Sequence, residues 1–256
     1  MTAEHAASVA RFVALRRTVA DLRRAIAFYC DGLGFHRTDT GDVVDEVPLA
    51  LGAQRIVLVR RGVGSAPAVA GPNVRFQHVA IVAGDWSAAF ARIQAFAPVA
   101  ISVGGPQQLP AASGGARAFK FRDPDGHPVE LIAFAAGQGA ACWRAQARRD
   151  AGPTLGIDHA AISVTQADRS IAFYQGLGFR LGARQTNRGV EQARLDGLVG
   201  SAVEVEVVAL VPPDMPTPHL ELLAYHTPAP TRGAANAQGV ADQLDWQSHA
   251  ACVGLG

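Results

Sequence analysis

The sequence predicts an α+β protein built from repeats of one unit, in which a strand and a helix precede three further strands (βαβββ). Ile26 and Ile171, whose numbers differ by 145, each begin the tetrapeptide IAFY, and GLGF follows both copies of it. A strand-like segment with alternating apolar residues precedes each copy, and further strand-like runs follow. Another copy of the pattern begins between them, at residue 76. The unit is therefore expected three times in succession.

The first copy begins with FVALRRTV at residues 12–19, whose alternation predicts a strand. Leu22, Ile26 and Tyr29 then recur at helical spacing, so a helix is expected, and the glycines of GLGF are expected to end it. The run RIVLVRR at residues 55–61 predicts a later strand of this copy.

The second copy starts with FQHVAIV at residues 76–82, a predicted strand. Asp85 is a suitable N-cap for the next helix, in which Trp86, Phe90 and Ile93 would form one apolar stripe. The runs ARAFKF and PVELIAF then predict two strands joined by a turn.

The third copy repeats the pattern with IDHAAISV at residues 157–164, a helix through Ile171 and Tyr174, and the strand-like runs VEVEVVAL and HLELLAY. A fourth copy begins with WQSHAACVGL at residues 246–255, which matches the third copy around His-Ala-Ala. This last copy is expected to lack its helix and three strands. Unpaired strand edges would remain, which favours a homodimer or a soluble aggregate.

Composition excludes several classes of protein. The formal net charge is +1, which gives no basic surface for nucleic acid or for an anionic membrane. Three cysteines without a C-x-x-C pair indicate free thiols rather than disulfides or a zinc knuckle. The sequence has no signal-peptide pattern and no apolar run long enough to span a bilayer. A soluble cytoplasmic protein is expected.

The stretch KFRDPDGHPVELIAF at residues 120–134 places a carboxylate in an apolar run. Its Pro-Asp-Gly turn predicts a β-hairpin with Asp123, Asp125 and His127 as surface turn residues. Glu130 alternates with apolar neighbours, and an unpaired carboxylate that faced a core would be costly. Glu130 is therefore expected to face either solvent or a cation.

The repeated βαβββ units, the IAFY and GLGF tetrapeptides and the turn FRDPDGHPVEL together resemble the vicinal oxygen chelate superfamily of glyoxalase, bleomycin-resistance and extradiol dioxygenase proteins. The resemblance implies paired βαβββ units that form incomplete barrels around a divalent metal ion. It divides the chain into a first domain of two units at 12–135, a linker at 136–154 and a second domain at 155–256. The second domain would hold one complete unit and the start of another.

In that superfamily the metal ligands lie on the first and last strands of each unit. The resemblance gives these candidate ligands: His78, Glu130, His159, Glu221 and His249. The first copy has Ala14 at the first position and no acidic residue at the last, so the first domain would hold only half a site. Two protein ligands rarely hold a catalytic metal.

The second domain would have two imidazoles and one carboxylate, from His159, Glu221 and His249. Such a set can hold one face of an octahedral ion and leave positions open for substrate and dioxygen. The ion would be Fe(II), Mn(II), Zn(II) or Ni(II). Gln247 is an alternative ligand to His249, and His159 is alternatively a satisfied core histidine.

Arg16 shares one face of the first strand with Ala14 and Thr18, the face expected to look into a cavity. It would bind a carboxylate or phosphate of the substrate, or else face solvent. The polar segment at 183–197 is expected to be an exposed loop or a flap over the cavity. No residue stands out as a general base, so the catalytic residues stay unknown.

These observations favour a metal-dependent enzyme of glyoxalase or dioxygenase type that acts on a small vicinal-oxygen substrate. One alternative is a non-catalytic binding or resistance protein whose cavity takes up a small molecule. Another is an inactive truncated paralogue. His78 and Glu130 are expected to point into one cavity of the first domain, and His159 and Glu221 into another in the second.

Overall fold

The computed structural model describes most of the chain. It gives the backbone of residues 8–41, 45–60, 71–73, 77–147, 152–198, 200, 202–213, 215–231 and 243–250. Side chains are described for the same residues except 8–12, 77 and 243–250.

The first copy follows the predicted order of strand, helix and strands. Its elements are β1 (Ser8–Val19), α1 (Leu22–Ala27), the π-helical turn η1 (Phe28–Gly32), β2 (His36–Arg37), β3 (Glu46–Leu51) and β4 (Gln54–Arg60). Asp21 caps α1, because its carboxylate accepts a hydrogen bond from the amide of Arg24 at 3.1 Å.

The second copy has the same order, with short extra strands after its helix. Its elements are β5 (Gln77–Ala83), α2 (Trp86–Gln94), β6 (Val99–Ala100), β7 (Gln107–Gln108), the 3₁₀ turn η2 (Ala111–Ser113), β8 (Arg117–Arg122) and β9 (Pro128–Ala133). Asp85 caps α2 as predicted, accepting from the amide of Ala88 at 3.1 Å.

The third copy contains β10 (Thr154–Ser163), α4 (Ala167–Gly176), β11 (Arg180–Arg188), α5 (Val190–Leu195), β12 (Glu204–Val211) and β13 (His219–Thr227). The expectation of an exposed loop at 183–197 is wrong, since this segment is the end of β11 followed by α5. The alternative of a segment over the cavity agrees with Asn187 and Gln192, which line it. β11 is an antiparallel edge strand, and ion pairs to β12 from Arg184 and Arg188 explain its polar sequence. Two elements remain: α3 (Ala141–Ala147) between the copies, and β14 (Gln243–Ala250).

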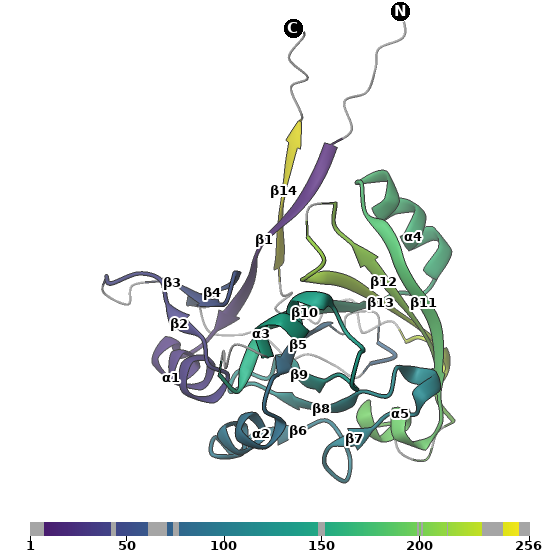
Figure 1. Ribbon diagram of the computed structural model, residues 1–256, viewed down its shortest axis with the longest axis horizontal. Helices are drawn as coiled ribbons and strands as arrows, with labels where there is room; N and C mark the ends of the chain where they lie inside the picture. The colour runs from purple at the N-terminus through teal and green to yellow at the C-terminus, as the bar shows by residue number, and fades with distance from the viewer. Residues whose placement is uncertain are drawn as a thin grey trace, which may run out of the picture.

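The strands of the described residues form two sheets, in which the copies pair in an unexpected order (Figure 1). One sheet has the order β14-β1-β4-β3-β2, and the other has β11-β12-β13-β10-β5-β9-β8-β6 with β7 beside β8. The first strands of the copies pair antiparallel, β5 with β10 and β1 with β14. The second copy therefore shares a sheet with the third, and the expected pairing of the first copy with the second is wrong. The domain boundaries themselves stay a prediction.

The first and second copies pack together through a common hydrophobic core instead of a shared sheet. Leu15 and Val19 of β1 lie in this core with Val79 and Ile81 of β5. Phe28 of η1 packs edge-on against Phe96, with ring centroids 5.5 Å apart. The apolar faces of the two sheets, with α1, η1 and α2 between them, explain why these copies associate face to face.

The third copy has a smaller core of its own. Ile171 of α4 and Phe179 pack there against Leu220 and Leu222 of β13. Figure 1 shows α4 far from α1 and α2, at the other side of the molecule.

The turn at 123–127 is a hairpin turn, as predicted, but Asp123 and His127 at its two ends are buried and Asp125 is half-buried. Asp123 and His127 are each 5% exposed. The carboxylate of Asp123 accepts from the Tyr29 hydroxyl at 2.8 Å, and Arg17 lies 3.4 Å from the same oxygen. These residues are buried because the turn packs against the end of β1, where His127 Nε2 lies 2.8 Å from the carbonyl oxygen of Thr18.

The expected linker at 136–154 contains a helix and the start of a strand. Trp143 of α3 is buried, and it packs with Ala80, Ile132 and Leu155 of the large sheet. Among the helices of the described residues, none has both the length and the apolarity needed to cross a bilayer.

Candidate metal centre

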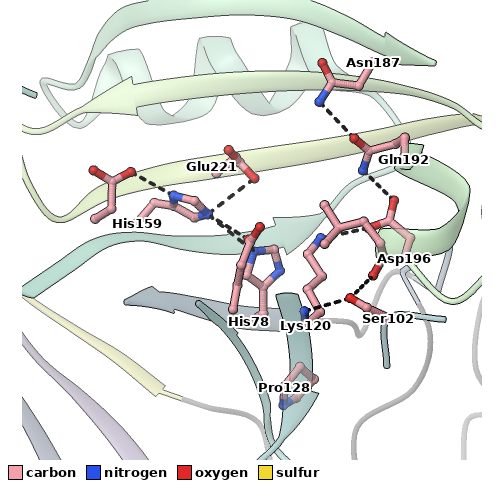
Figure 2. A network of polar contacts seen from close by, with 12 residues as sticks. His78, Ser102, Lys120, Pro128, His159, Asn187, Gln192, Asp196 and Glu221 are labelled. Carbon is pink, nitrogen blue, oxygen red and sulfur yellow. Dashed lines mark hydrogen bonds and ion pairs between the residues drawn. The ribbon is translucent and has the colours of Figure 1, made fainter. Parts of the chain in front are cut away.

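Four predicted ligands converge at the middle of the large sheet. His78 lies on β5, Glu130 on β9, His159 on β10 and Glu221 on β13, which are adjacent strands. His78 Nε2 is 2.9 Å from Glu130 Oε2, and His159 Nε2 is 3.4 Å from His78 Nε2. His159 Nε2 is also 3.6 Å from Glu130 Oε2 and 3.7 Å from Glu221 Oε1. Figure 2 shows His78, His159 and Glu221 directed toward one another.

The strand register explains this convergence. Ala161 lies opposite His78 on one side and opposite Glu221 on the other. In the next row, Ala80 lies between Glu130 and His159. Both alanines are buried, so each row has a small residue between two larger ones. The space above the alanines allows the four polar side chains to meet.

The donor atoms fit a divalent ion. Bonds of about 2.0–2.2 Å to nitrogen and oxygen place neighbouring donors of one ion roughly 3 Å apart, close to the separations seen here. The ligating atoms of His78, His159 and Glu221 all lie within 4.8 Å of one another. Two imidazoles and two carboxylates without a thiolate suit Mn(II), Fe(II), Ni(II) or Zn(II), and two carboxylates balance the charge of the ion.

Electrostatics keep the carboxylates ready to bind a cation. Burial opposes ionisation of Glu130, but Lys120 and the two histidines hold the pKa of this carboxyl well below its usual range. Burial and the charge of Lys120 lower the pKa of His78 to about 4. Burial also disfavours a charged His159, yet the surrounding carboxylates, Glu221 first, raise its pKa well above the usual value. Without metal, His159 therefore carries the positive charge at the centre.

A β-bulge shapes the strand that carries His159. Ile157 pairs with Ile81 and His159 with Ala80, so Asp158 is an extra residue in β10. Asp158 and His159 consequently both line the same cavity, although neighbouring strand residues normally face opposite ways. Asp158 Oδ2 lies 3.0 Å from His159 Nδ1.

The centre opens into a cavity of about 230 Å³. Lys120 lines it and forms an ion pair with Asp196, with Nζ 2.8 Å from Oδ1. Asp196 Oδ2 accepts from Gln192 at 2.8 Å and from Tyr225 at 3.0 Å. Asn187 donates to Gln192 at 3.1 Å and completes the chain of contacts in Figure 2. These contacts tie β8 of the second copy to α5 of the third.

The structure brings together His78, Glu130, His159 and Glu221, which the sequence had assigned to two separate sites. The expected half-site and the expected three-ligand site are replaced by one four-donor centre, because the second copy pairs with the third. His249 is not brought there: it lies on β14, opposite Val9 of the other sheet, and its side chain is outside the described residues. Arg16 lies in that other sheet too and forms an ion pair with Glu46, so it does not line this cavity.

Lys120 and Asp158 line the cavity but were not predicted from the sequence, whereas Asn187 and Gln192 belong to the segment expected as a possible flap. Lys120 had a detectable signal, since it interrupts the apolar strand run ARAFKF just as Glu130 interrupts PVELIAF. Asp158 had no such signal in the sequence, because only the β-bulge places it on the same side of the sheet as His159.

Comparison with known proteins agrees with this architecture. The profile of the "Glyoxalase/Bleomycin resistance protein/Dioxygenase superfamily" matches residues 9–131 and 156–249. Among curated proteins, no significant match exists.

Solved structures of glyoxalase I from Zea mays share the fold. One superposes with a TM-score of 0.58 at 21% identity, covering 85% of this chain and 68% of that one. A valine-to-glutamate mutant of the same enzyme gives a TM-score of 0.59 at 20% identity, covering 86% and 69%. At such identities the likeness shows the fold alone. The family profile covers most of the chain, and the chain therefore belongs to the Glyoxalase/Bleomycin resistance protein/Dioxygenase superfamily.

Proposed function

We propose that this protein is a divalent-metal-dependent enzyme with an active site where its second and third copies meet, between β5 and β10. The observation that carries the proposal is the meeting of four side chains. His159 Nε2 lies 3.4–3.7 Å from donor atoms of His78, Glu130 and Glu221, and His78 Nε2 lies 2.9 Å from Glu130 Oε2. Each copy contributes one histidine from its first strand and one glutamate from its last. If the polar pairs His78–Glu130 and His159–Glu221 had unrelated roles, they would not be expected at equivalent positions of two copies.

The donor count favours a redox-neutral reaction. Four protein ligands, His78, Glu130, His159 and Glu221, would leave fewer positions for other groups on the ion than three ligands do, enough for a substrate with two adjacent oxygen atoms. A three-ligand set of two histidines and one carboxylate leaves more, enough for dioxygen as well. When bound, the ion would supply Lewis-acid polarisation of the substrate oxygens. An isomerase or lyase therefore fits better than a dioxygenase.

Glu221 is the proposed base for a proton on the carbon beside those oxygens, through the carboxylate oxygen that would not contact the ion. The Glu221 side chain is 16% exposed and faces the cavity, whereas the Glu130 side chain is 6% exposed. Glu130 also lies beside His78, and its lowered pKa makes it a poor proton acceptor. Lys120 would keep its charge, because Asp196 and Glu130 raise its pKa in spite of burial.

The cavity favours a small, uncharged substrate. Its volume of about 230 Å³ is below the roughly 300–1,000 Å³ typical of drug-sized ligand sites. Lys120 is the cationic Lys or Arg side chain among the residues that line it, and Asp196 already neutralises that charge. A polyanionic substrate would find little to bind here.

Metal titration tests the proposal. The wild-type protein should bind one equivalent of Ni(II), Zn(II) or Mn(II), and the His159→Ala, Glu221→Ala double variant should lose most of this uptake. His226→Ala is the matched control, because His226 follows Glu221 on β13 but its side chain is 54% exposed. Equal uptake by the wild type and the double variant would end the enzymatic interpretation.

The positions left for substrate can be tested separately with acetohydroxamate, which binds through two adjacent oxygens. The visible spectrum of the Co(II)-loaded protein should change on addition of this probe. An unchanged spectrum would contradict the proposed mode of substrate binding.

A non-catalytic binding protein is the second candidate. His159, with its raised pKa, sits among three carboxylates, so a proton on His159 already neutralises part of the negative charge of the metal-free centre. Such a protein would bind its small molecule equally well in the presence of a chelator. Cytoplasmic location and homodimer formation, both expected from the sequence, stay predictions.

A further inference from the structure

Asp158 uses both of its carboxylate oxygens. Oδ1 accepts a hydrogen bond from Trp143 Nε1 at 2.6 Å, and Oδ2 lies 3.0 Å from His159 Nδ1. Asp158 is 4% exposed and Trp143 is 3% exposed, so water competes little for either contact. Two donors from different segments thus meet one buried carboxylate.

The contact determines which nitrogen of His159 can bind an ion. A neutral imidazole carries one N–H and one lone pair. When Nδ1–H donates to Asp158, the lone pair is on Nε2, the atom that faces His78, Glu130 and Glu221. A carboxylate on the far nitrogen of a metal-binding histidine fixes both its tautomer and its orientation.

Trp143 in turn holds Asp158. Its ring packs over β10, where a Cβ added at Gly156 would lie 2.7 Å from the indole. The indole has a single donor, and Asp158 receives it. Trp143 belongs to α3, the helix that connects the second copy to the third.

We infer that Trp143 and Asp158 are positioning residues for the metal centre: the connecting helix, through Trp143, fixes the carboxylate that presents Nε2 of His159 to the ion. The inference rests on the proposed metal site. His219 also faces Asp158, with Nδ1 3.9 Å from Oδ2, too far for a hydrogen bond.

Replacing Asp158 by Asn tests the geometry, because an amide has one acceptor oxygen and one donor nitrogen. While Trp143 holds the oxygen, the amide nitrogen faces His159 Nδ1 and forces the proton onto Nε2, where it blocks the ion. In a Trp143→Phe background the amide is free to turn, and its oxygen can again accept from Nδ1. Removal of Trp143 should therefore rescue the Asp158→Asn variant.

The experiment is a double-mutant cycle read by Zn(II) affinity in a chelator competition. Asp158→Asn should weaken binding about 10–100-fold, the range typical for such outer residues. Trp143→Phe should weaken it less, and the double variant should bind more tightly than Asp158→Asn alone. Asp168→Asn is the matched control, because Asp168 lies on α4 with a side chain 83% exposed. Unchanged affinity in Asp158→Asn, or additive losses in the double variant, would overturn the inference.

A second readout needs no metal. In metal-free protein labelled with ¹⁵N-histidine, at a pH high enough to leave His159 neutral, His159 of Asp158→Asn should show the Nε2–H tautomer, and that of the double variant the Nδ1–H tautomer. The same tautomer in both would refute the inference even if Trp143→Phe folds poorly. His159→Ala separates the two proposals: if that variant still binds zinc as the wild type does, the metal site fails, whereas the tautomers still decide the role of Asp158.

Discussion

Phe28 and Phe173 occupy the same place in the two IAFY tetrapeptides, yet Phe28 is 1% exposed and Phe173 is 62% exposed. The second copy covers Phe28 with Phe96 and Phe121, at ring distances of 5.5 and 6.3 Å. α4, which carries Phe173, contacts the strands of its own copy. The identical tetrapeptides therefore form similar local structure, but the burial of their phenylalanines depends on whether another copy packs over them.

The two helices also differ in length by one residue. The first copy reads IAFYCDGLGF and the third reads IAFYQGLGF. The extra residue is accommodated in η1, a π-helical turn in which the amide of Leu33 donates to the carbonyl of Phe28 at 3.2 Å. Both glycine-containing turns then bring a phenylalanine, Phe35 or Phe179, back into a core.

Truncating the covered ring should have the largest effect. Phe28→Ala leaves a cavity between two copies and should lower the free energy of unfolding by about 3–5 kcal/mol. Phe173→Ala is the matched control and should change it by less than about 0.5 kcal/mol. Urea denaturation measures both values. Equal losses would show that α4 is covered in solution.

A smaller loss is expected at the polar contact between the first two copies. Arg17→Met leaves Asp123 buried without its cation, which should cost about 3 kcal/mol. The neighbouring Arg16→Ala removes only a partly exposed ion pair with Glu46 and should cost about 0.2–1 kcal/mol. If the two variants unfold at the same urea concentration, the docking of the turn at 123–127 contributes little.

Disrupting the contact between Lys120 of the second copy and Asp196 of the third should lower the free energy of unfolding by less. Asp196→Asn removes the charge opposite Lys120 but leaves the amide able to contact Gln192 and Tyr225. We expect a loss of about 1–3 kcal/mol in the free energy of unfolding. A loss above that of Phe28→Ala would reverse the ranking of the two contacts between copies.

The exposed face of α4 should affect association more than stability. A homodimer that buries Phe173 would be disrupted by Phe173→Asp, with little change in melting temperature. Light scattering on both proteins at several concentrations measures this effect. A wild-type protein that is monomeric at every concentration would contradict the expected dimer.

The repeat made the βαβββ units predictable, because tetrapeptides, helical spacing and turn residues are local properties. The matching positions on first and last strands also predicted that His78 would lie near Glu130 and His159 near Glu221, as the structure has them, while their role as metal ligands stays a prediction. The partnership of the copies could not be predicted, since nothing local in a first strand specifies which other first strand it joins. The place of Asp158 in the cavity could not be predicted for a related reason, because a β-bulge depends on the register of two strands.

The order of the copies has a consequence for how tightly an ion would be held. Each side of the connecting segment 136–154 supplies one histidine and one glutamate, which alone would form a weak two-donor site. Because one chain carries both pairs, the second pair is present at high effective concentration once the first has bound. The two His–Glu pairs would thus act together as one chelating site, although each pair alone would bind weakly. A bound ion would also cross-link the second and third copies and raise the free energy of unfolding by mass action.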